Sequence, residues 1–392
     1  MMTDKIFEDN DDIPEGETLE VPKEIRRLNI DTHDYPVEVI VKKILDRDII
    51  LRPQYQRDFI WDRKKSSLLI ESILLNIPLP PIYLAEEDDG SLSVIDGLQR
   101  LTTFVEYFED KFPLRNMEGE GLIDLNKLTY SGLKKSFPKA KRILNRGNIR
   151  TIVVNKDSDP DIKYDIFERL NSGSVKLNDQ EIRNCIYHGP LNDIVMGSYD
   201  KENQEYKQDG LRHNEHLMSA MNLKKAHSRY LDAEVVLRML AIIQYRDSLN
   251  SKYKSSMKLL INDLMKEKGD SSTDEIQNLA SIFNATMEKI YRVFEAKTFK
   301  RYEGENIEKT LNRSIMDCLA CTFIDYDIDH LVLKQAGIVE LMDNMLNSDD
   351  QQFINENGAS FRDSVTKWTS SKSVLKSRIK LWRDNFRELM GS

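Results

Sequence analysis

The sequence runs Val94-Ile95-Asp96-Gly97-Leu98-Gln99-Arg100-Leu101-Thr102-Thr103 where an apolar segment gives way to a helical pattern. The apolar residues from Leu92 to Ile95 predict a β-strand, and Asp96-Gly97 predicts a tight turn after it. A helix is expected from Leu98 to Glu109, because one buried face is formed by Leu101, Phe104, Val105 and Phe108. This strand–turn–helix arrangement presents free backbone N–H groups and a guanidinium to an anion, so it predicts a phosphate site.

Each polar residue of this turn has a predicted role. Gly97 allows the backbone to approach an oxygen ligand, and the planar fork of Arg100 is suited to binding two oxygens. Asp96 has three candidate roles, which are holding Mg²⁺, orienting Arg100 and positioning a water molecule. Gln99 is a candidate ligand of a base, a ribose or a water molecule. In the structural alternative, Asp96 only caps the helix and Arg100 forms a surface ion pair.

Two further segments complete a pattern of motifs. Upstream the sequence reads Pro53-Gln54-Tyr55-Gln56-Arg57-Asp58-Phe59-Ile60-Trp61, and downstream it reads Ile166-Phe167-Glu168-Arg169-Leu170-Asn171-Ser172-Gly173, followed by Leu177, Glu181 and Arg183. With the central turn, these segments resemble the P-x-F/Y-Q-R-x-x-x-W box, the DGQQR motif and the F-E-R-x-N-x-G segment of a large bacterial family. That family forms the N-terminal part of GmrSD-type modification-dependent restriction enzymes and of related phage-defence proteins. The resemblance covers Val37 to Cys185, and Leu98 stands where the family has Gln.

The resemblance implies an α+β fold, with a small mixed-sheet N-terminal domain similar to the ParB/sulfiredoxin superfamily. It also implies an NTP and Mg²⁺ as cofactors, with Asp96 as the metal ligand. The implied nucleotide contacts are Gly97, Gln99, Arg100, Gln56, Arg57 and Asn171. If the NTP is hydrolysed, the candidate catalytic residues are Asp96, Gln99 and Arg100. The structural alternatives are a surface Arg57 beside core aromatics, and buried Glu–Arg pairs around Glu168 and Glu181.

The composition favours a soluble globular protein of two domains. The chain has 392 residues, of which 40% are hydrophobic and 31% are charged. Eight acidic residues and one lysine between Met1 and Glu20 carry most of the net charge of −9, so residues 1–30 are expected to form an acidic flexible leader. A nucleotide-site domain is expected over residues 31–188, and an all-α domain over residues 189–392. The chain is expected to be cytoplasmic, because neither a signal peptide nor an apolar run long enough to span a membrane is found.

Coarse patterns place the remaining elements. A short helix is expected from Val37 to Ile49 and a strand from Ile49 to Leu51. Asp62 is expected to cap a helix from Arg63 to Asn76 with the apolar stripe Leu68, Leu69, Ile73 and Leu74. Strands are expected at Ile82–Leu84, Leu92–Ile95 and Ile149–Val154, and Asn178 with Glu181 forms a variant capping box. Helices of the second domain are expected at Leu231–Ile243, Leu259–Met265, Ile276–Phe294, Ile315–Phe323, Ile338–Met345 and Val374–Leu389.

Two basic blocks contain no acidic residue. The first, within residues 127–150, supplies the candidate nucleic-acid-binding residues Lys134, Lys135, Lys139, Lys141, Arg142 and Arg146. The second, within residues 364–383, contains Lys367, Lys372, Lys376, Arg378, Lys380 and Arg383, with Trp368 and Trp382 among them. A basic surface with aromatic residues is typical of proteins that follow a phosphate backbone. The alternative is that these are solvated helix faces and that the tryptophans are core residues.

Neither the cysteines nor the histidines predict a metal centre. Cys318 and Cys321 form one C-x-x-C in an apolar helical pattern, so buried thiols are favoured over a zinc site. His213 and His216 share a helical spacing, but the layout of a ββα-metal nuclease does not follow them.

Three hypotheses of function result. In the first, the chain is a ParB-like NTP-binding protein of phage defence or DNA restriction, which couples the NTP state to DNA or to a partner protein such as a nuclease, with hydrolysis left open. In the second it is a DNA-binding adaptor without turnover. In the third it is a DNA endonuclease with an unrecognised site.

Overall fold

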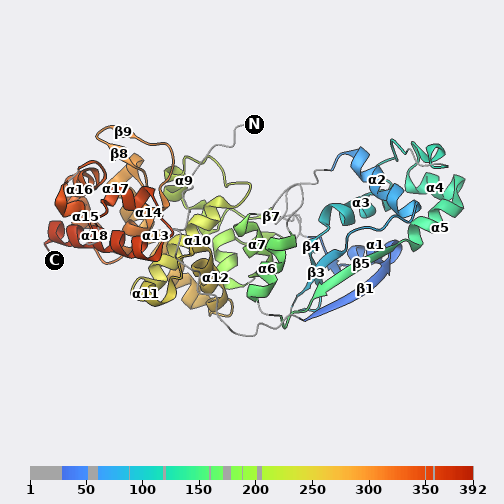
Figure 1. Cartoon of the computed structure of the whole chain (residues 1–392), viewed down its shortest axis with the longest axis horizontal. Coiled ribbons are helices and arrows are strands. Elements are labelled where there is room, and N and C mark those ends of the chain that lie inside the picture. Colours follow the sequence, from blue (N-terminus) through green and yellow to red (C-terminus); the bar gives the residue numbers. More distant parts are fainter. Residues whose placement is uncertain are drawn as a thin grey trace. The chain divides into compact units, whose positions relative to one another are not determined.

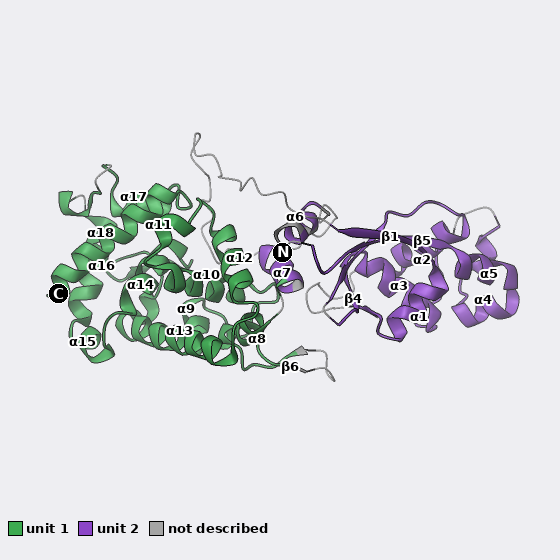
Figure 2. Ribbon diagram, turned by 90° about the horizontal axis from the view of Figure 1, so that it is seen from below, with its two compact units in different colours: residues 1–23, 187–392 green, residues 24–186 purple. Residues whose placement is uncertain are grey.

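The structure is a computed structural model, and it describes residues 29–51, 61–87, 89–117, 121–158, 160–170, 178–187, 189–200, 205–348, 350–355 and 358–391. The chain divides into two compact units between Ile186 and Tyr187, coloured purple and green in Figure 2. They are called here the N-terminal unit (described residues 29–186) and the C-terminal unit (described residues 187–391). Residues 1–28 of the predicted acidic leader lie outside the described residues.

The N-terminal unit is built on a five-stranded mixed sheet (Figure 1). Its strands are β1 (Ile30–Pro36), β2 (Ile49–Ile50), β3 (Ile82–Glu86), β4 (Leu92–Asp96) and β5 (Asn148–Val154). Their order in the sheet is β1-β5-β3-β4-β2. β1 pairs antiparallel with β5 and β3 antiparallel with β4, whereas β5 with β3 and β4 with β2 are parallel pairs. The predicted α+β class with a mixed sheet is confirmed.

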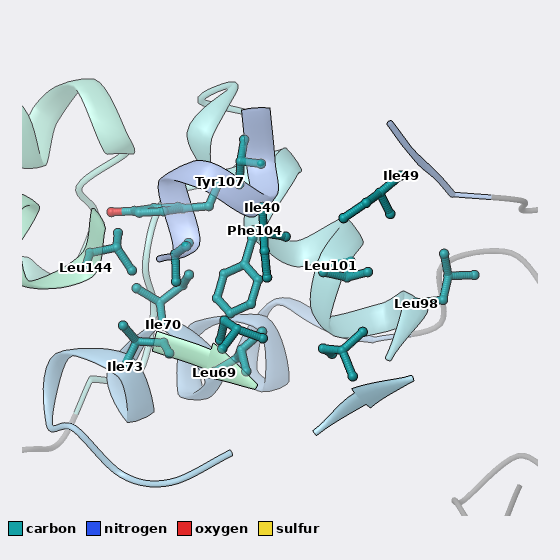
Figure 3. Close-up of a cluster of buried hydrophobic side chains, with 14 of the residues drawn as sticks. Ile40, Ile49, Leu69, Ile70, Ile73, Leu98, Leu101, Phe104, Tyr107 and Leu144 are labelled. Carbon is teal, nitrogen blue, oxygen red and sulfur yellow. The ribbon is translucent and has the colours of Figure 1, made fainter. Parts of the chain in front are cut away.

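The helices of the N-terminal unit are α1 (Val37–Leu45), α2 (Arg63–Leu74), α3 (Leu98–Phe108), α4 (Tyr130–Ser136), α5 (Pro138–Arg146), α6 (Pro160–Leu170) and α7 (Asp179–Ile186), with a 3-10 turn at Ile123–Leu125. Residues of α1 to α5 join the sheet in one hydrophobic core. Figure 3 shows how α1, α2, α3 and α5 contribute to the core, with Ile40, Ile70, Phe104 and Leu144 pointing toward one another. The predicted strand–turn–helix at β4 and α3 is therefore anchored by its apolar face.

Helix α2 begins as the sequence predicts, but its buried stripe is rotated. The Asp62 carboxylate accepts a hydrogen bond from the backbone N–H of Lys65 at 2.8 Å, which is the expected N-cap. The buried apolar residues are Leu69, Ile70 and Ile73, whereas Leu68 is 43% exposed. The prediction of Leu68 as a core residue was wrong, because Ile70 occupies the inward position that the pattern left ambiguous.

Strand β1 had no sequence prediction, because its residues are mostly exposed and polar. It is an edge strand whose register places Asp34 opposite Arg150 on β5. The two oxygens of Asp34 accept hydrogen bonds from Nε and Nη2 of Arg150, both at 3.0 Å. This bidentate pair lowers the pKa of the Asp34 carboxyl and raises that of Arg150. Cross-strand charge pairing thus accompanies a strand that has little apolar surface to bury.

The C-terminal unit is mainly helical. Its helices are α8 (Pro190–Met196), α9 (Glu215–Ala220), α10 (Leu231–Tyr245), α11 (Leu249–Lys252), α12 (Met257–Glu267), α13 (Thr273–Phe294), α14 (Arg313–Phe323), α15 (Ile328–Leu333), α16 (Gln335–Asn347), α17 (Phe361–Thr366) and α18 (Lys372–Met390). Two hairpins of two-residue strands are added, β6 (Tyr199–Asp200) with β7 (Glu205–Tyr206) and β8 (Tyr302–Glu303) with β9 (Asn306–Ile307). The six long helices expected beyond residue 230 are confirmed, with ends that differ by a few residues.

Buried ion pairs link three helices of this unit. Asp317 of α14 is fully buried and accepts hydrogen bonds from Nε and Nη2 of Arg238 on α10, at 2.9 and 2.8 Å. The same carboxylate accepts one from Nη2 of Arg378 on α18, at 2.9 Å. Arg378 is therefore an internal residue, so its assignment to a basic surface, made from the sequence, was wrong. Trp382, which is also fully buried, is a core residue.

The two cysteines on α14 are buried thiols, as predicted. Cys318 and Cys321 are free, and burial raises the pKa of both thiols. Within the described part of the chain, no helix combines the length and the apolar character needed to cross a membrane.

Candidate functional site

The turn between β4 and α3 requires a glycine for two local reasons. Gly97 has φ of 102°, a left-handed conformation that residues with a Cβ rarely adopt. A Cβ at this position would also collide with the side chain of Ile82, a buried residue of β3, and approach Nη2 of Arg100 to 3.2 Å. The space beside Gly97 is thus filled by protein atoms, so the close approach of a ligand to this Cα does not follow from the glycine.

The guanidinium of Arg100 is bonded to three oxygens of the protein. Its Nη2 donates to the Asp96 carboxylate at 2.8 Å and to the backbone carbonyl of Pro81 at 3.1 Å. Its Nη1 donates to the carbonyl of Pro80. The side chain is only 12% exposed, and burial lowers the pKa of Arg100 against the opposing effect of Asp96. The fork that the sequence assigned to a phosphate therefore fastens the α3 turn to the segment that enters β3.

Asp96 orients Arg100 and does not cap α3. The N-cap residue of α3 is Gly97, and within the described residues no side chain caps this helix, so the structural alternative in which Asp96 caps it was wrong. Its side chain is 48% exposed even though Oδ2 is shared with Arg100. This geometry leaves the carboxylate accessible from solvent, as a metal ligand must be.

The first turn of α3 has backbone donors without acceptors. The first intrahelical bond runs from the N–H of Leu101 to the carbonyl of Gly97 at 2.9 Å. Within the described residues, the N–H groups of Leu98 and Arg100 donate no hydrogen bond. Together with the helix dipole, such donors form a region of positive potential. Gln99 lies half-buried in the same turn. Its backbone carbonyl accepts a hydrogen bond from the hydroxyl of Thr103 at 2.8 Å.

The third sequence motif lies beside the second. Helix α6, which carries Glu168 and Arg169 on its exposed surface, packs next to β4 within the N-terminal unit. In α7, Arg183 is buried and donates from Nη1 to Oε1 of Gln180 at 3.2 Å. Tyr164 of α6 is also buried, and its burial raises the pKa of the phenol. Of the polar residues of this motif that the structure describes, Glu181 and Arg183 are therefore buried, whereas Glu168 and Arg169 are exposed.

The predicted capping box at the start of α7 is confirmed. The backbone N–H of Asn178 donates to Oε2 of Glu181 at 2.6 Å, and the N–H of Glu181 donates to Oδ1 of Asn178 at 2.8 Å. Glu181 is 2% exposed. Its buried carboxylate therefore bonds the start of α7.

Three predicted nucleotide contacts cannot be placed. Gln56, Arg57 and Asn171 lie outside the described residues. Trp61, the last residue of the first motif, is half-buried against the core of the N-terminal unit.

The first basic block forms α4 and α5. Thr129 caps α4 and Pro138 opens α5, so the two helices follow each other with Phe137 between them. The predicted nucleic-acid residues are exposed except for Lys141, which is intermediate. Lys139, Arg142 and Arg146 are spaced for one face of α5. Within the described chain, no salt bridge involves Lys134, Lys135, Lys139, Lys141, Arg142 or Arg146.

The histidine pair has local structural contacts. His216 stacks on Tyr291 with ring centroids 4.7 Å apart. Burial and the nearby Arg212 lower the pKa of His213. Among the described residues, no cluster of three or more His, Cys, Asp or Glu side chains could hold a metal ion.

Sequence reasoning missed the oxygens that hold Arg100. They are backbone carbonyls of Pro80 and Pro81, which no side-chain pattern identifies. A partial signal existed, because a Pro-Pro pair directly before β3 must lie near the end of β4 once these two strands pair antiparallel.

Comparisons with known proteins agree with the position of these motifs. Residues 37–188 match the family described as GmrSD restriction endonuclease, N-terminal domain. An uncharacterized protein of Methanocaldococcus jannaschii is 32% identical, over 28% of this chain and 24% of the relative, so the match spans about a quarter of that relative's length. No solved structure matches the chain.

The matched residues include the β4–α3 turn, the exposed α4–α5 cations and the α6–α7 hairpin. The chain therefore carries, over residues 37–188, an N-terminal domain of the GmrSD restriction endonuclease family.

Proposed function

We propose that the N-terminal unit binds a nucleoside triphosphate with Mg²⁺ at the first turn of α3. In this proposal the protein acts in phage defence or in modification-dependent DNA restriction, and the bound NTP controls its association with DNA or with a partner protein such as a nuclease. The observation that carries the proposal is the start of α3, where two backbone N–H groups without an acceptor among the described residues lie beside a half-exposed carboxylate.

The local charges favour an anion at this turn. A helix N-terminus carries about half a positive charge, and Arg100 adds a full one beside it. Asp96 offsets only the guanidinium, so the first turn of α3 keeps its positive potential. Phosphate oxygens are the ligands that such a turn attracts.

The residues present also fit a hard divalent cation. Asp96 offers Oδ1, which makes no hydrogen bond within the described residues, to a Mg²⁺ that would also bind phosphate oxygens. When bound, the metal ion would neutralise phosphate charge. Arg100 positions Asp96 and the turn through its bonds to the two proline carbonyls.

Equilibrium binding of NTPs in the presence of Mg²⁺ tests this proposal. Asp96→Asn should weaken NTP binding by roughly tenfold or more, because the amide cannot neutralise the metal ion. Asp34→Asn is a matched control, since Asp34 is 47% exposed and also pairs with an arginine of the same sheet. Wild-type protein without NTP affinity, or equal affinities in wild type and Asp96→Asn, would remove the idea.

A second candidate function rests on α4 and α5. Six neighbouring cations without salt bridges in the described chain are suited to the phosphate backbone of DNA, as the sequence predicted. This surface would make the protein a DNA-binding adaptor, with or without NTP.

The salt dependence of DNA affinity tests the second function. Replacing Lys134 and Lys139 by Gln should reduce the slope of log K against log[salt] by about 2. The same replacement at the exposed pair Lys224 and Lys225 in the C-terminal unit provides the control. An unchanged slope in the Lys134/Lys139 variant would count against DNA binding by α4 and α5.

A further inference from the structure

The C-terminal unit contains a basic pocket on one side of α18. A hollow of about 310 Å³ lies between this helix and the segment formed by the end of α10 and α11. Helix α11 packs on α18 in the same unit. The cations that line the hollow are Arg246, Lys372, Lys376, Lys380, Arg383 and Arg387. The acidic residues in its lining are Asp247 and Asp384, so the positive charges outnumber the negative ones.

Four of these cations, Lys372, Lys376, Arg383 and Arg387, form no salt bridge within the described residues. Arg246, by contrast, has carboxylate partners, because its Nη1 lies 2.9 Å from Asp325 and its Nε lies 3.4 Å from Asp247. Unpaired cations that share one hollow repel one another, so an anion placed among them gains more than it would at an isolated lysine.

The cations of α18 recur at helical spacing. Lys372, Lys376, Arg383 and Arg387 are separated by multiples of three to four residues, which places them on one face. Lys376 and Arg387 are exposed, while Arg383 is half-buried and donates from Nη2 to Sγ of Cys321 at 2.9 Å. That contact fixes the Arg383 guanidinium among the residues that line the pocket.

The floor of the pocket is apolar. Leu375 and Ile379 of α18 are buried, at 2% and 7% exposure, and Leu249 faces them from α11. The Tyr253 hydroxyl is committed to the carbonyl of Ser370 at 2.7 Å, so its ring adds apolar surface. An apolar floor below a cationic rim suits a ligand with both an apolar part and phosphate groups.

We propose that this pocket binds a small organic phosphate of nucleotide size. Its phosphate groups would lie on Lys376, Arg383 and Arg387, and its apolar or aromatic part on Leu375 and Ile379. The hollow falls within the usual size range of ligand pockets. A nucleic-acid backbone, by contrast, needs neither a hollow nor an apolar floor. The site belongs to the C-terminal unit and is independent of the α3 turn.

Calorimetric titration of the full-length protein with ATP in EDTA provides the test. The chelator removes the Mg²⁺ on which the α3 site is proposed to depend. The double variant Lys376→Gln/Arg387→Gln should lose roughly tenfold or more in affinity, because each change removes a charge-assisted contact. The variant Asp384→Asn should bind ATP more tightly, because it removes negative charge from the pocket. The three substituted residues are exposed and form no salt bridge within the described chain. The variants should therefore unfold at the same temperature as the wild type.

Lys309→Gln/Lys334→Gln serves as the matched control, since both lysines are exposed and have no ion pair in the described residues. Its affinity should equal that of wild type. Inorganic tripolyphosphate should bind more weakly than ATP, because it cannot use the apolar floor.

Three results would overturn the assignment. They are equal ATP affinity in wild type and the pocket variant, equal affinity for tripolyphosphate and ATP, and binding of a single-stranded oligonucleotide without any binding of ATP. If ATP binding in EDTA is lost in Asp96→Asn and kept in the pocket variant, the ligand belongs to the α3 turn and the pocket proposal fails alone.

Discussion

Arg100 and Gly97 hold the β4–α3 turn in place by different means. Arg100 spans the turn through Asp96 and the carbonyls of Pro80 and Pro81. A cation at a helix N-terminus is electrostatically unfavourable, so the ion pair with Asp96 is needed for Arg100 to occupy this position. Gly97 supplies the backbone angle and leaves room for Ile82. The turn is therefore arranged before any ligand arrives.

Replacing Gly97 by Ala should destabilise the N-terminal unit by about 1–3 kcal/mol. The alanine backbone must adopt a strained φ, and its Cβ must displace the Ile82 side chain. Gly90→Ala separates the two causes, since Gly90 has φ of 80° but nothing within 4 Å of a Cβ. Denaturant unfolding of both variants provides the measurement. If Gly97→Ala lowers the free energy of unfolding no more than Gly90→Ala does, the contact of the Cβ with Ile82 does not destabilise the protein.

Single residues show where sequence reasoning succeeds and where it ends. Orienting Arg100 was one of the three roles that the sequence left open for Asp96, and the ion pair between the two residues is formed. The engagement of Arg100 by two proline carbonyls depends on the pairing of β3 with β4, which is set by tertiary contacts. The sequence could identify the chemical groups of the site, but it could not say which of them the protein itself uses.

At the scale of elements, apolar spacing predicts what is buried and misses what is exposed. α3, α10 and α13 have strong apolar faces, and they were found close to their true ends. β1 was missed because its polar residues are held by backbone pairing to β5 and by the Asp34–Arg150 ion pair. The buried stripe of α2 was predicted on the wrong face, because the adjacent apolar residues Leu68, Leu69 and Ile70 fit two helical faces equally well.

The start of α4 is held by an aspartate of the turn that follows α3. Asp110 follows α3, and its carboxylate accepts hydrogen bonds from the backbone N–H of Ser131 at 2.7 Å and from the Ser131 hydroxyl. These bonds lower the pKa of the Asp110 carboxyl from its ordinary value of 3.8. Because α4 carries part of the basic surface, Asp110 also fixes where those lysines lie.

Ser131→Ala should lower the free energy of unfolding by about 0.5–1 kcal/mol at pH 7, because one charge-assisted hydrogen bond is lost at an exposed position. Since the pKa of Asp110 is lower in the folded state, its contribution is complete above pH 3.8 and disappears as the pH falls through the lowered value. The difference between variant and wild type should therefore shrink in acid. Urea unfolding as a function of pH measures it.

Ser136→Ala is the control, because Ser136 is an exposed serine of α4 with no hydrogen bond from its side chain in the described chain. A difference between Ser131→Ala and wild type that persists unchanged at pH 2 would contradict the assignment to Asp110.

At the scale of the whole molecule, each unit has its own core. Leu101 in the N-terminal unit and Leu240 in the C-terminal unit are both fully buried. Either leucine changed to Ala should cost about 2–5 kcal/mol, and the loss should be confined to the unit that contains the change.

Hydrogen exchange followed by mass spectrometry gives the readout for each unit separately. Leu101→Ala should speed exchange in peptides of α1, α2 and α3, and Leu240→Ala in peptides of α10 and α14. Faster exchange throughout the chain in either variant would show that the two units unfold together.

Asp317 has a consequence for the integrity of the chain. Its carboxylate binds two guanidinium groups at once, and one of them comes from α18. A nonsense mutation or a proteolytic cut upstream of α18 would leave Asp317 in a region opened to water, with α14, α16 and α17 exposing the apolar surface that α18 covered. Such a shortened product should be recognised by quality-control proteases, so its cellular half-life, rather than its specific activity, would be the first property to fall.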